Sequence, residues 1–341
     1  MSQQGVLVTG GAGYIGSHVV RQLGERGERL VVLDNLATGF RDAVMYGEFV
    51  QGDTGDAALV DRLLRDNEIG AVLHFAAHIV VPESVADPLK YYHNNTVKTR
   101  SLLECCHRAG VEHFIFSSTA AVYGVPKAIP VAEQAALDPI NPYGRSKLMS
   151  EWMLRDLAEA SALRYVILRY FNVAGADPLG RMGQATPDAT HLIKVACEAA
   201  AGRRRQVAVY GTDYPTPDGT GIRDYIHVED LADAHLRALD YLREGGKSAI
   251  LNCGYGHGYS VREVLDMVQK VAGKRLDIVD APRRPGDPPA LAADAGLITA
   301  TLGWKPRYDD LEFIVRTALE WERKLAAGTA FAATHETLTS H

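Results

Sequence analysis

The sequence predicts an α/β fold, in which a doubly wound parallel sheet carries a smaller α/β lobe. Short, strongly apolar runs alternate with amphipathic stretches through the first half of the chain, as expected when parallel strands are buried between two layers of helices. The first run ends in a glycine-rich turn that opens a helix, and the alternation stops after Phe171. A length of 341 residues is long for one small core, which favours two unequal lobes.

Seven apolar runs are predicted to be strands of this sheet. They lie at 5–10, 29–34, 48–53, 71–76, 113–118, 164–169 and 249–254. Amphipathic patterns typical of helices lie between them, beginning with 14–27, and indicate right-handed crossovers between parallel strands. A further helix is predicted at 228–242, and the run that follows it is expected to return to the sheet.

The chain after Phe171 predicts a second lobe. Residues 175–190 are rich in Gly, Pro, Asp and Thr, which is typical of a long ordered loop. The later predicted elements are a helix at 259–273, a strand at 275–279 and a helix from about Asp309 to Ala327. Residues 328–341 show no periodicity and are expected to be loose.

Composition and charge exclude several classes of function. The net charge is −6, so neither nucleic acid nor an anionic membrane surface is expected as a partner. No apolar run approaches the ~20 residues that span a bilayer, and the N-terminus enters a strand without a signal peptide, which favours the cytoplasm. The four cysteines (Cys105, Cys106, Cys197 and Cys253) show no disulfide or metal spacing, so we expect buried thiols and no bound metal.

The glycine-rich turn predicts where a dinucleotide binds. In VTGGAGYIGS, Gly10, Gly13 and Gly16 follow the first predicted strand and open the first predicted helix. Glycines at this spacing let the backbone turn sharply and bring the helix N-terminus close to a pyrophosphate. Asp34 ends the second strand, where a carboxylate accepts from an adenosine ribose and repels a 2′-phosphate, which favours NAD over NADP. The alternative is a glycine turn without a nucleotide.

This turn also predicts the domain organisation. Residues 1–174 are expected to form a dinucleotide-binding domain of the Rossmann type, to which residues 225–255 return. Residues 175–224 and 256–327 are then expected to form the substrate-binding lobe.

A tyrosine and a lysine in NPYGRSKLMSE are candidates for proton chemistry. Tyr143 and Lys147 are four residues apart in a predicted helix, so the phenol and the ammonium share one face. A free phenol has a pKa of about 10, so action as a base near neutral pH needs a shift of roughly 3 units, which a nearby cation favours. The pair follows the strand at 113–118, at the edge where ligands bind open α/β sheets. Alone, this spacing is also compatible with a surface coincidence.

Thr119 lies just past the end of that same strand, in SSTAAVYG. Its hydroxyl can hydrogen-bond the substrate oxygen that Tyr143 deprotonates. The alternative role is a hydroxyl that caps the following loop.

These segments carry a resemblance to a known family. TGGAGYIG, SSTAAVYG and YGRSK together resemble the extended short-chain dehydrogenase/reductase superfamily. Within it, three further segments resemble the UDP-glucose 4-epimerase family: LDNLATG (33–39), GRRRQVAVYGTDYPTPDGTGIRDYIHVEDLADAH (202–235) and APRRPGD (281–287). The resemblance covers about residues 5–325, and the block that begins at Tyr210 is hard to obtain by chance.

The resemblance implies interconversion of UDP-glucose and UDP-galactose through a transient 4-keto sugar. Tyr143 would take the proton from the sugar 4-hydroxyl while hydride passes from C4 to tightly held NAD, and hydride would return to the opposite face after the keto sugar turns. Thr119 would steer the 4-oxygen, and Lys147 would bind the nicotinamide ribose and lower the tyrosine pKa. One acid/base that transfers a proton in both directions suits a redox-neutral cycle.

The same resemblance implies a set of contacts to NAD. Asp53 follows the third predicted strand and would meet the adenine, and Asn94 would lie near the cofactor. For Phe75 and Tyr170, packing in the core is an alternative or simultaneous role. The expected cofactor-binding residues are Gly10, Gly13, Tyr14, Ile15, Gly16, Asp34, Asn35, Asp53, Thr54, Phe75, Ala76, Ala77, Asn94, Ser117, Tyr143, Lys147 and Tyr170.

A UDP-sugar brings two phosphates to a protein of net negative charge. The resemblance assigns these to Arg223 and Arg284, since guanidinium binds phosphate oxygens bidentately. It leaves the role of Arg283 open. Asp287 would accept from the uridine ribose, and Tyr210 would stack on or border the uracil. The expected substrate-binding residues are Thr119, Tyr143, Asn172, His191, Leu192, Val207, Val209, Tyr210, Arg223, Tyr225, Arg284, Asp287 and Leu291.

Three positions depart from the family pattern. Ile79 stands where many bacterial members carry lysine, which removes one possible hydrogen bond to the cofactor. Thr190 and His191 stand where a paired asparagine is usual near the uridine, and His191 is the expected contact. Leu291 occupies the position whose bulk gates N-acetylated sugars: tyrosine there tends to exclude them and a small residue to admit them, so leucine leaves the substrate range open.

Other functions on this fold stay open to different degrees. A nucleotide-sugar 4,6-dehydratase needs an acidic pair after the threonine, where this chain has Ala120 and Ala121, which cannot transfer protons. Epimerases of UDP-GlcNAc, of UDP-xylose or UDP-arabinose, or of UDP-uronate share the predicted site. A non-catalytic NAD-binding sensor is disfavoured by the intact Tyr–Lys pair. The resemblance further implies a homodimer through the helices around 93–109 and 146–161.

Overall fold

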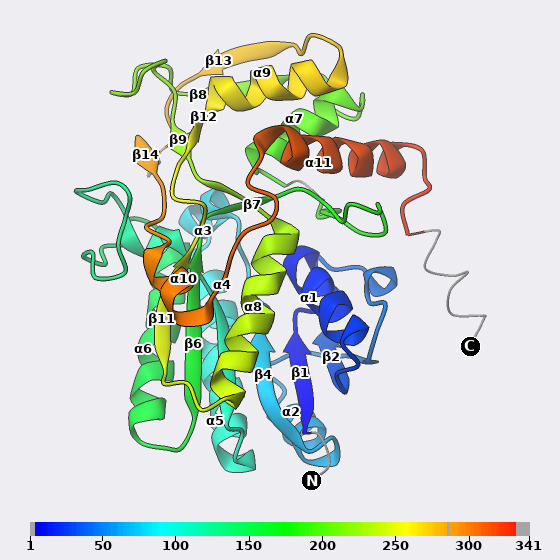
Figure 1. The fold of residues 1–341 in the computed structure, drawn as a ribbon, viewed down its shortest axis with the longest axis vertical. Coiled ribbons are helices and arrows are strands. Elements are labelled where there is room, and N and C mark those ends of the chain that lie inside the picture. The colour runs from blue at the N-terminus through cyan, green and yellow to red at the C-terminus, as the bar shows by residue number, and fades with distance from the viewer. Residues whose placement is uncertain (1–3, 188, 285–286, 332–341) are drawn as a thin grey trace.

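A seven-stranded parallel sheet forms the centre of the protein, as shown by a computed structural model that describes residues 4–187, 189–284 and 287–331. The spatial order of the strands is β11-β6-β5-β4-β1-β2-β3, and every neighbouring pair is parallel. The strands are β1 (Gly5–Thr9), β2 (Leu30–Asp34), β3 (Glu48–Gln51), β4 (Ile69–His74), β5 (His113–Thr119), β6 (Arg164–Tyr170) and β11 (Ala249–Cys253). The predicted doubly wound sheet is confirmed (Figure 1), and β11 lies beside β6 as expected.

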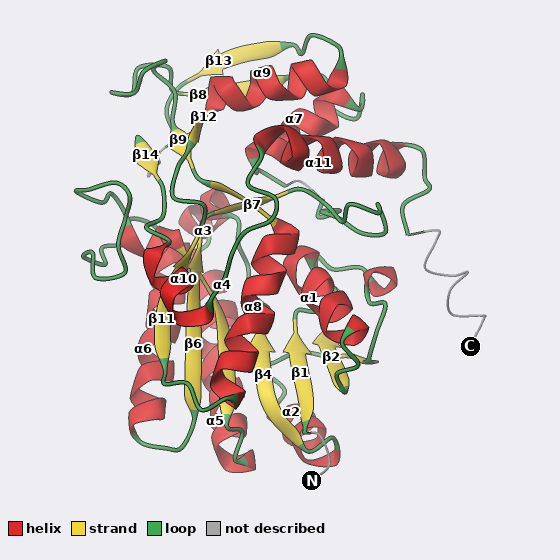
Figure 2. Cartoon of the chain, in the orientation of Figure 1, coloured by secondary structure: helices red, strands yellow, loops and turns green. Residues whose placement is uncertain are grey.

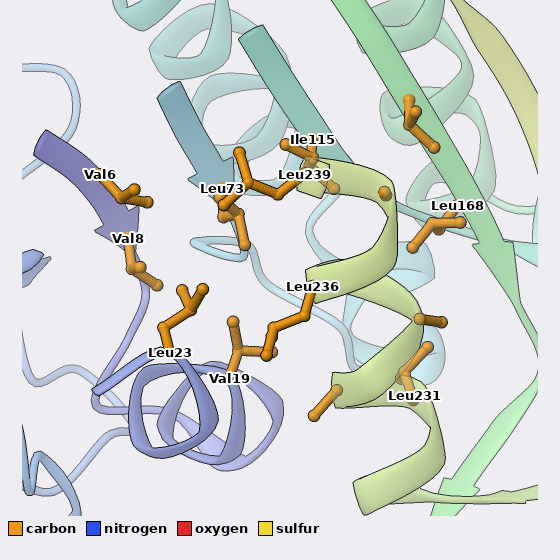
Figure 3. Packing of buried hydrophobic residues seen from close by; sticks show 14 of the residues in the cluster. Val6, Val8, Val19, Leu23, Leu73, Ile115, Leu168, Leu231, Leu236 and Leu239 are labelled. Atoms are coloured by element: carbon orange, nitrogen blue, oxygen red, sulfur yellow. The ribbon is translucent and has the colours of Figure 1, made fainter. Parts of the chain in front are cut away.

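Helices cover both faces of the sheet because its strands are apolar on both faces. One layer holds α1 (Tyr14–Glu25) and α8 (Val228–Arg243), and the other holds α2 (Ala57–Asp66), α5 (Lys98–Ala109) and α6 (Pro142–Glu159). In β1, Val6 and Val8 pack toward α1 and α8, whereas Leu7 belongs to the opposite core. Figure 3 shows the first of these cores, in which Val19 and Leu236 meet from the two helices.

The second lobe lies beyond the carboxyl ends of the strands (Figure 1). Its helices share one apolar core with its small sheets. The helices are α7 (Leu192–Ala200), α9 (Val261–Ala272) and α11 (Leu311–Ala326), and the paired strands are β8 (Val207–Tyr210) with β13 (Ile278–Ala281), and β9 (Ile222–Arg223) with β12 (Tyr259–Ser260) and β14 (Ala290–Leu291). A parallel pair, β7 (Asn172–Ala174) with β10 (Tyr225–His227), connects the lobe to the main sheet.

Shorter helices complete the described chain (Figure 2). They are η1 (Arg41–Ala43), α3 (Val81–Ala86), α4 (Pro88–Tyr91), the π-helix η2 (Tyr92–Val97), η3 (Ala120–Tyr123) and α10 (Gly296–Leu302). Of the tail at 328–341, only residues 328–331 are described; there the Phe331 ring stacks on Phe40 at a centroid distance of 5.8 Å. The expectation of a loose tail otherwise falls on residues outside the described part. Within the described residues, no helix has the length and apolarity to cross a membrane.

Candidate functional site

The glycine turn between β1 and α1 has the geometry of an anion cradle. Gly10 has a φ of +71°, and a Cβ there would lie 2.5 Å from the backbone N of Ala76. A Cβ on Gly16 would lie 2.2 Å from the Gly10 carbonyl oxygen, so only glycine lets α1 approach the turn. The first turn of α1 holds no acidic residue, and Gly13 offers no capping side chain, so the amides at this helix end suit a phosphate. The residues present therefore fit a dinucleotide.

Asp34, at the end of β2, closes one side of this turn. Its Oδ2 accepts from the Ala12 amide at 2.9 Å and its Oδ1 from the Leu36 amide at 2.8 Å. Burial raises the pKa of Asp34, and the two amide hydrogen bonds oppose that shift. A carboxylate has about four acceptor positions, so two amides leave capacity for a ribose hydroxyl.

A second carboxylate lies beside Asp34, at the end of the neighbouring strand. Asp53 accepts from Asn35 Nδ2 at 3.2 Å and pairs with Lys98 Nζ at 2.6 Å. Its pKa stays below the usual value because the hydrogen bonds from Lys98, Gly55 and Asn35 together outweigh burial. The structure thus brings Asp34, Asn35 and Asp53 together at the carboxyl edge of β2 and β3.

Several expected cofactor contacts are also packing residues. The Phe75 ring lies 4.8 Å from the His235 ring and that of Tyr170 lies 6.2 Å from it, while the hydroxyl of Tyr170 hydrogen-bonds Ser117. The packing role considered for Phe75 and Tyr170 is therefore present in the structure. Tyr14 donates its hydroxyl to the Gly175 carbonyl at 2.6 Å, which leaves its backbone amide as the group that faces the turn.

The remaining expected contacts follow strand ends or open helices. Ala76 and Ala77 are half-buried after β4, Thr54 is buried after β3, and Ile15 is half-buried in the first turn of α1. Asn94 lies in η2 and donates to the neighbouring Asn95 at 3.1 Å.

Tyr143 lies in the first turn of α6, at the carboxyl end of β5. Pro142 opens this helix, and the Asn141 side chain caps it by accepting from the Gly144 amide at 2.9 Å. Tyr143 lies near Thr119, whose hydroxyl lowers the pKa of the phenol, and Thr119 Oγ1 accepts from the Ala121 amide at 3.1 Å. The capping role considered for Thr119 is therefore present, and its hydrogen bond to a substrate oxygen stays a prediction.

The electrostatics of Tyr143 differ from the sequence-based prediction. Burial raises its pKa to about 12, and among the described residues only the nearby Thr119 hydroxyl lowers it. Lys147 is itself buried, its Nζ lies 4.6 Å from the centroid of the Phe116 ring, and burial lowers its pKa to about 7. The expected depression of the tyrosine pKa by Lys147 is therefore not found, because desolvation penalises the charged form of each partner.

The two arginines expected to bind phosphate both lie in the second lobe. Arg223, on β9, places Nη2 3.8 Å from Asp287 Oδ1. The Arg284 guanidinium lies over the Tyr210 ring, with Cζ 3.8 Å from the centroid. In contrast, Arg283 pairs with Asp213 at 2.7 Å and is exposed, which accounts for the arginine whose role was left open.

Four expected substrate contacts line a single cavity between β7, β10 and α7. They are Asn172, His191, Leu192 and Tyr225. His191 is hydrogen-bonded to Gln184 Nε2 at 3.3 Å, and its pKa is lowered by burial and, to a smaller extent, by the charge of Arg284. Leu291 is buried in another apolar cluster, which also contains Phe171 and Val122.

Val207 and Val209, which were expected to bind substrate, could reach it only through their backbone. Both side chains are 1% exposed and lie in the core under α7 and α9. Successive side chains of a strand point to opposite faces, so Ala208 and Tyr210 lie on the open face of β8. Ala208 is a candidate that the sequence analysis missed, although the alternation of the strand could have identified it.

Glu151 is a second residue that the sequence analysis missed. It follows Lys147 by four residues on α6 and is completely buried against Arg169. The four-residue spacing of Lys147 and Glu151 can be read from YGRSKLMSE, but the pairing of Glu151 with Arg169 on β6 cannot.

Comparisons with known proteins show what the whole chain is similar to. The model of the NAD dependent epimerase/dehydratase family matches residues 6–254. A UDP-glucose 4-epimerase of Azospirillum brasilense is 60% identical over 321 residues, which cover 94% of this chain and 92% of the relative. The crystal structure of the UDP-glucose 4-epimerase from Brucella ovis in complex with NAD superposes with a TM-score of 0.91 at 49% identity, covering 94% of this chain and 98% of that one.

A third relative differs in its named substrates. The UDP-Glc/GlcNAc 4-epimerase from Campylobacter jejuni is 50% identical, with a TM-score of 0.83 over 94% of this chain and 99% of that one. The glycine turn, the Tyr–Lys pair and these similarities lead to one conclusion: the chain belongs to the NAD dependent epimerase/dehydratase family.

Proposed function

We propose that this protein interconverts UDP-glucose and UDP-galactose by NAD-dependent epimerisation at C4. The observation that carries the proposal is that Tyr143 and Lys147, on one face of α6, meet Thr119 at the end of β5, on the same carboxyl edge of the sheet as the glycine turn after β1. The names of the Azospirillum and Brucella relatives support it.

Each residue then has a stated task. Arg223 and Arg284 hold the diphosphate, and Asn172 and His191 border it from the cavity side. Tyr143 takes the proton of the 4-hydroxyl and later returns it to the 4-oxygen, while Thr119 holds that oxygen by a hydrogen bond. Bound NAD supplies the acceptor and donor of the C4 hydride and, when oxidised, a positive charge near the phenol.

The chain contributes to the charge balance around this proton transfer. With a pKa of about 12 for Tyr143, phenolate formation at pH 7 costs roughly 7 kcal/mol, at ~1.4 kcal/mol per unit. Thr119 reduces this cost by donating to the phenolate, and the ammonium form of Lys147, which would bind the nicotinamide ribose, would reduce it further. Proton and hydride both return, so the cycle has no net redox change.

The experiment is incubation of the protein with UDP-galactose, without added NAD, and separation of the nucleotide sugars. UDP-glucose without net NADH supports epimerisation. A 4-keto-6-deoxy sugar would instead indicate a dehydratase, which Ala120 and Ala121 disfavour because neither transfers a proton. If no UDP-sugar is interconverted, the proposed function is rejected, and the result favours the alternative of a non-catalytic NAD-binding sensor.

A wider substrate range is a second candidate. The relative from Campylobacter jejuni, whose name includes both Glc and GlcNAc, favours it. We propose that Leu291 sets this substrate range. Its side chain belongs to an apolar cluster that also contains Ala120 and Val122, and Ala120 directly follows Thr119 in the sequence.

We also propose that the protein is a homodimer through the helices around 93–109 and 146–161, which are η2, α5 and α6. Exposed apolar side chains on η2 and α6, and on α3 and α4, which contact them, support this. The group consists of Val85, Leu89, Val97, Met149 and Trp152, with Leu89 75% exposed. Light scattering should give twice the chain mass, and Trp152→Glu should give monomers. A wild-type mass of one chain would reject the dimer.

A further inference from the structure

A buried glutamate lies behind the two residues of the proposed proton transfer. Tyr143, Lys147 and Glu151 follow one another at four-residue intervals on α6 and therefore share one face of the helix. Glu151 is 0% exposed. Placing a carboxylate in such a position is costly unless its oxygens are satisfied, so its partners identify what it holds.

Three donors from two strands reach this carboxylate. Ser118 Oγ donates to Glu151 Oε1. Arg169 Nε donates to the same oxygen at 3.1 Å, and Arg169 Nη2 donates to Glu151 Oε2 at 2.6 Å. Ser118 directly precedes Thr119 on β5, and Arg169 directly precedes Tyr170 on β6. Glu151 thus ties the helix that carries Tyr143 to the strand whose end carries Thr119.

Arg169 is held in turn from its other side. Its Nη1 donates to the Tyr123 hydroxyl at 3.1 Å and to the Glu133 carbonyl at 3.2 Å. Tyr123 donates to Asn252 Oδ1, on β11, at 2.6 Å. The guanidinium is therefore fixed by three neighbours, and a carboxylate bound to it has little freedom to move.

Glu151 also changes the electrostatics at Lys147. This ammonium faces Glu151 on α6, His74 on β4 and the uncharged ring of Phe116 on β5. Tyr143 lies one turn before it on the same face of α6. His74 is neutral, since burial and the Lys147 charge lower its pKa to about 3. Glu151 is the carboxylate among these groups, and its charge opposes the desolvation of the ammonium.

We propose that Glu151 is a positioning residue for the epimerase site: it aligns Tyr143 with Thr119 and keeps Lys147 in its ammonium form. The inference rests on the proposed function for the role of Lys147, but the geometry of the Glu151 network is independent of it. Glu151 touches no reacting atom and acts through Lys147 and through the register between α6 and β5.

The test follows Lys147 directly, by NMR titration of protein labelled with ¹³C at lysine Cε, using Lys147→Arg to assign the signal. In Glu151→Gln the ammonium loses its carboxylate, so its titration midpoint should move to lower pH by about one unit or more. The high-pH limb of kcat for UDP-galactose should move in the same direction. An unchanged midpoint would overturn the proposal.

Two further variants separate positioning from loss of stability. Glu151→Gln/Arg169→Met also removes the unpaired guanidinium, so it should fold better than Glu151→Gln and still show a lowered midpoint. Glu229→Gln breaks a comparably buried pair, with Arg21, far from Lys147; it should lower stability and leave the midpoint unchanged. A lowered midpoint in Glu229→Gln would show that the shift is nonspecific and would also overturn the proposal.

The titration does not depend on turnover. If wild-type protein fails to convert UDP-galactose, the proposed function fails, while the midpoints still decide whether Glu151 controls the charge of Lys147.

Discussion

Tyr143 lies near Thr119, whose hydroxyl lowers the pKa of the phenol, and the Thr119 oxygen accepts a hydrogen bond from the Ala121 amide. The helix that carries the phenol and the strand end that carries the hydroxyl are separated by more than twenty residues of chain. Their meeting places a proton donor and acceptor at the carboxyl edge of the sheet, two strands away from β1 and its glycine turn.

Removal of the phenolic hydroxyl should abolish proton transfer. Tyr143→Phe keeps the ring but not the acid/base, so kcat should fall by about 10²- to 10⁴-fold while NAD and UDP binding change little. Tyr46→Phe removes an exposed hydroxyl as a control and should keep normal turnover. Near-normal kcat in Tyr143→Phe would exclude this tyrosine as the base.

Loss of the Thr119 hydroxyl should act through the tyrosine pKa. Thr119→Val keeps the shape but removes the hydroxyl that lowers the pKa of Tyr143, so the low-pH limb of kcat should move to higher pH. The value of kcat at neutral pH should fall roughly 10- to 100-fold. Thr119→Ser should restore most of it. A pH profile of Thr119→Val identical to that of the wild type would contradict this role.

Lys147 should make stability depend on pH in a definite direction. Its pKa is about 7 in the folded protein and 10.5 as a free side chain, so between these values the unfolded chain binds more protons and stability rises with pH. Lys147→Met should therefore exceed wild type in stability at pH 6, by up to roughly 5 kcal/mol, and the difference should shrink toward pH 10. Urea unfolding at both pH values measures it. A difference that grows with pH would contradict the assignment.

The two phosphate arginines should affect substrate binding more than chemistry. Arg223→Gln and Arg284→Gln should each raise the KM for UDP-galactose roughly 10- to 100-fold, the range for a lost charged hydrogen bond. Arg283→Gln is the matched control, because Arg283 is exposed and paired with Asp213. Equal effects of all three substitutions would show that net charge matters, and not these two positions.

A larger side chain at position 291 should narrow the substrate range. Leu291 is buried beside Phe171, so a tyrosine there must extend into neighbouring space. Leu291→Tyr should keep turnover of UDP-galactose and lose that of UDP-GalNAc, measured on a panel that includes UDP-arabinopyranose. Unchanged selectivity would refute the role of this position.

Local patterns were enough to predict most of the architecture. The seven apolar runs, the glycine turn and the four-residue spacing of Tyr143 and Lys147 are each contained in a short stretch of chain. Backbone geometry translates such stretches directly into strands, turns and helix faces. The family resemblance added the candidate residues of the second lobe, among them Arg223 in the block from Tyr210 to His235 and Arg284 and Asp287 in APRRPGD.

Other features depended on contacts between distant segments. The core under β8 decided that the side chain of Val207 is buried and that of Ala208 lies on the open face. The packing of α6 on β6 decided that Glu151 pairs with Arg169. The pKa of Tyr143 is raised and not lowered, because burial is set by every element packed around the phenol. The four-residue spacing placed phenol and ammonium on one face; desolvation, which arises only in the assembled fold, decided their charges.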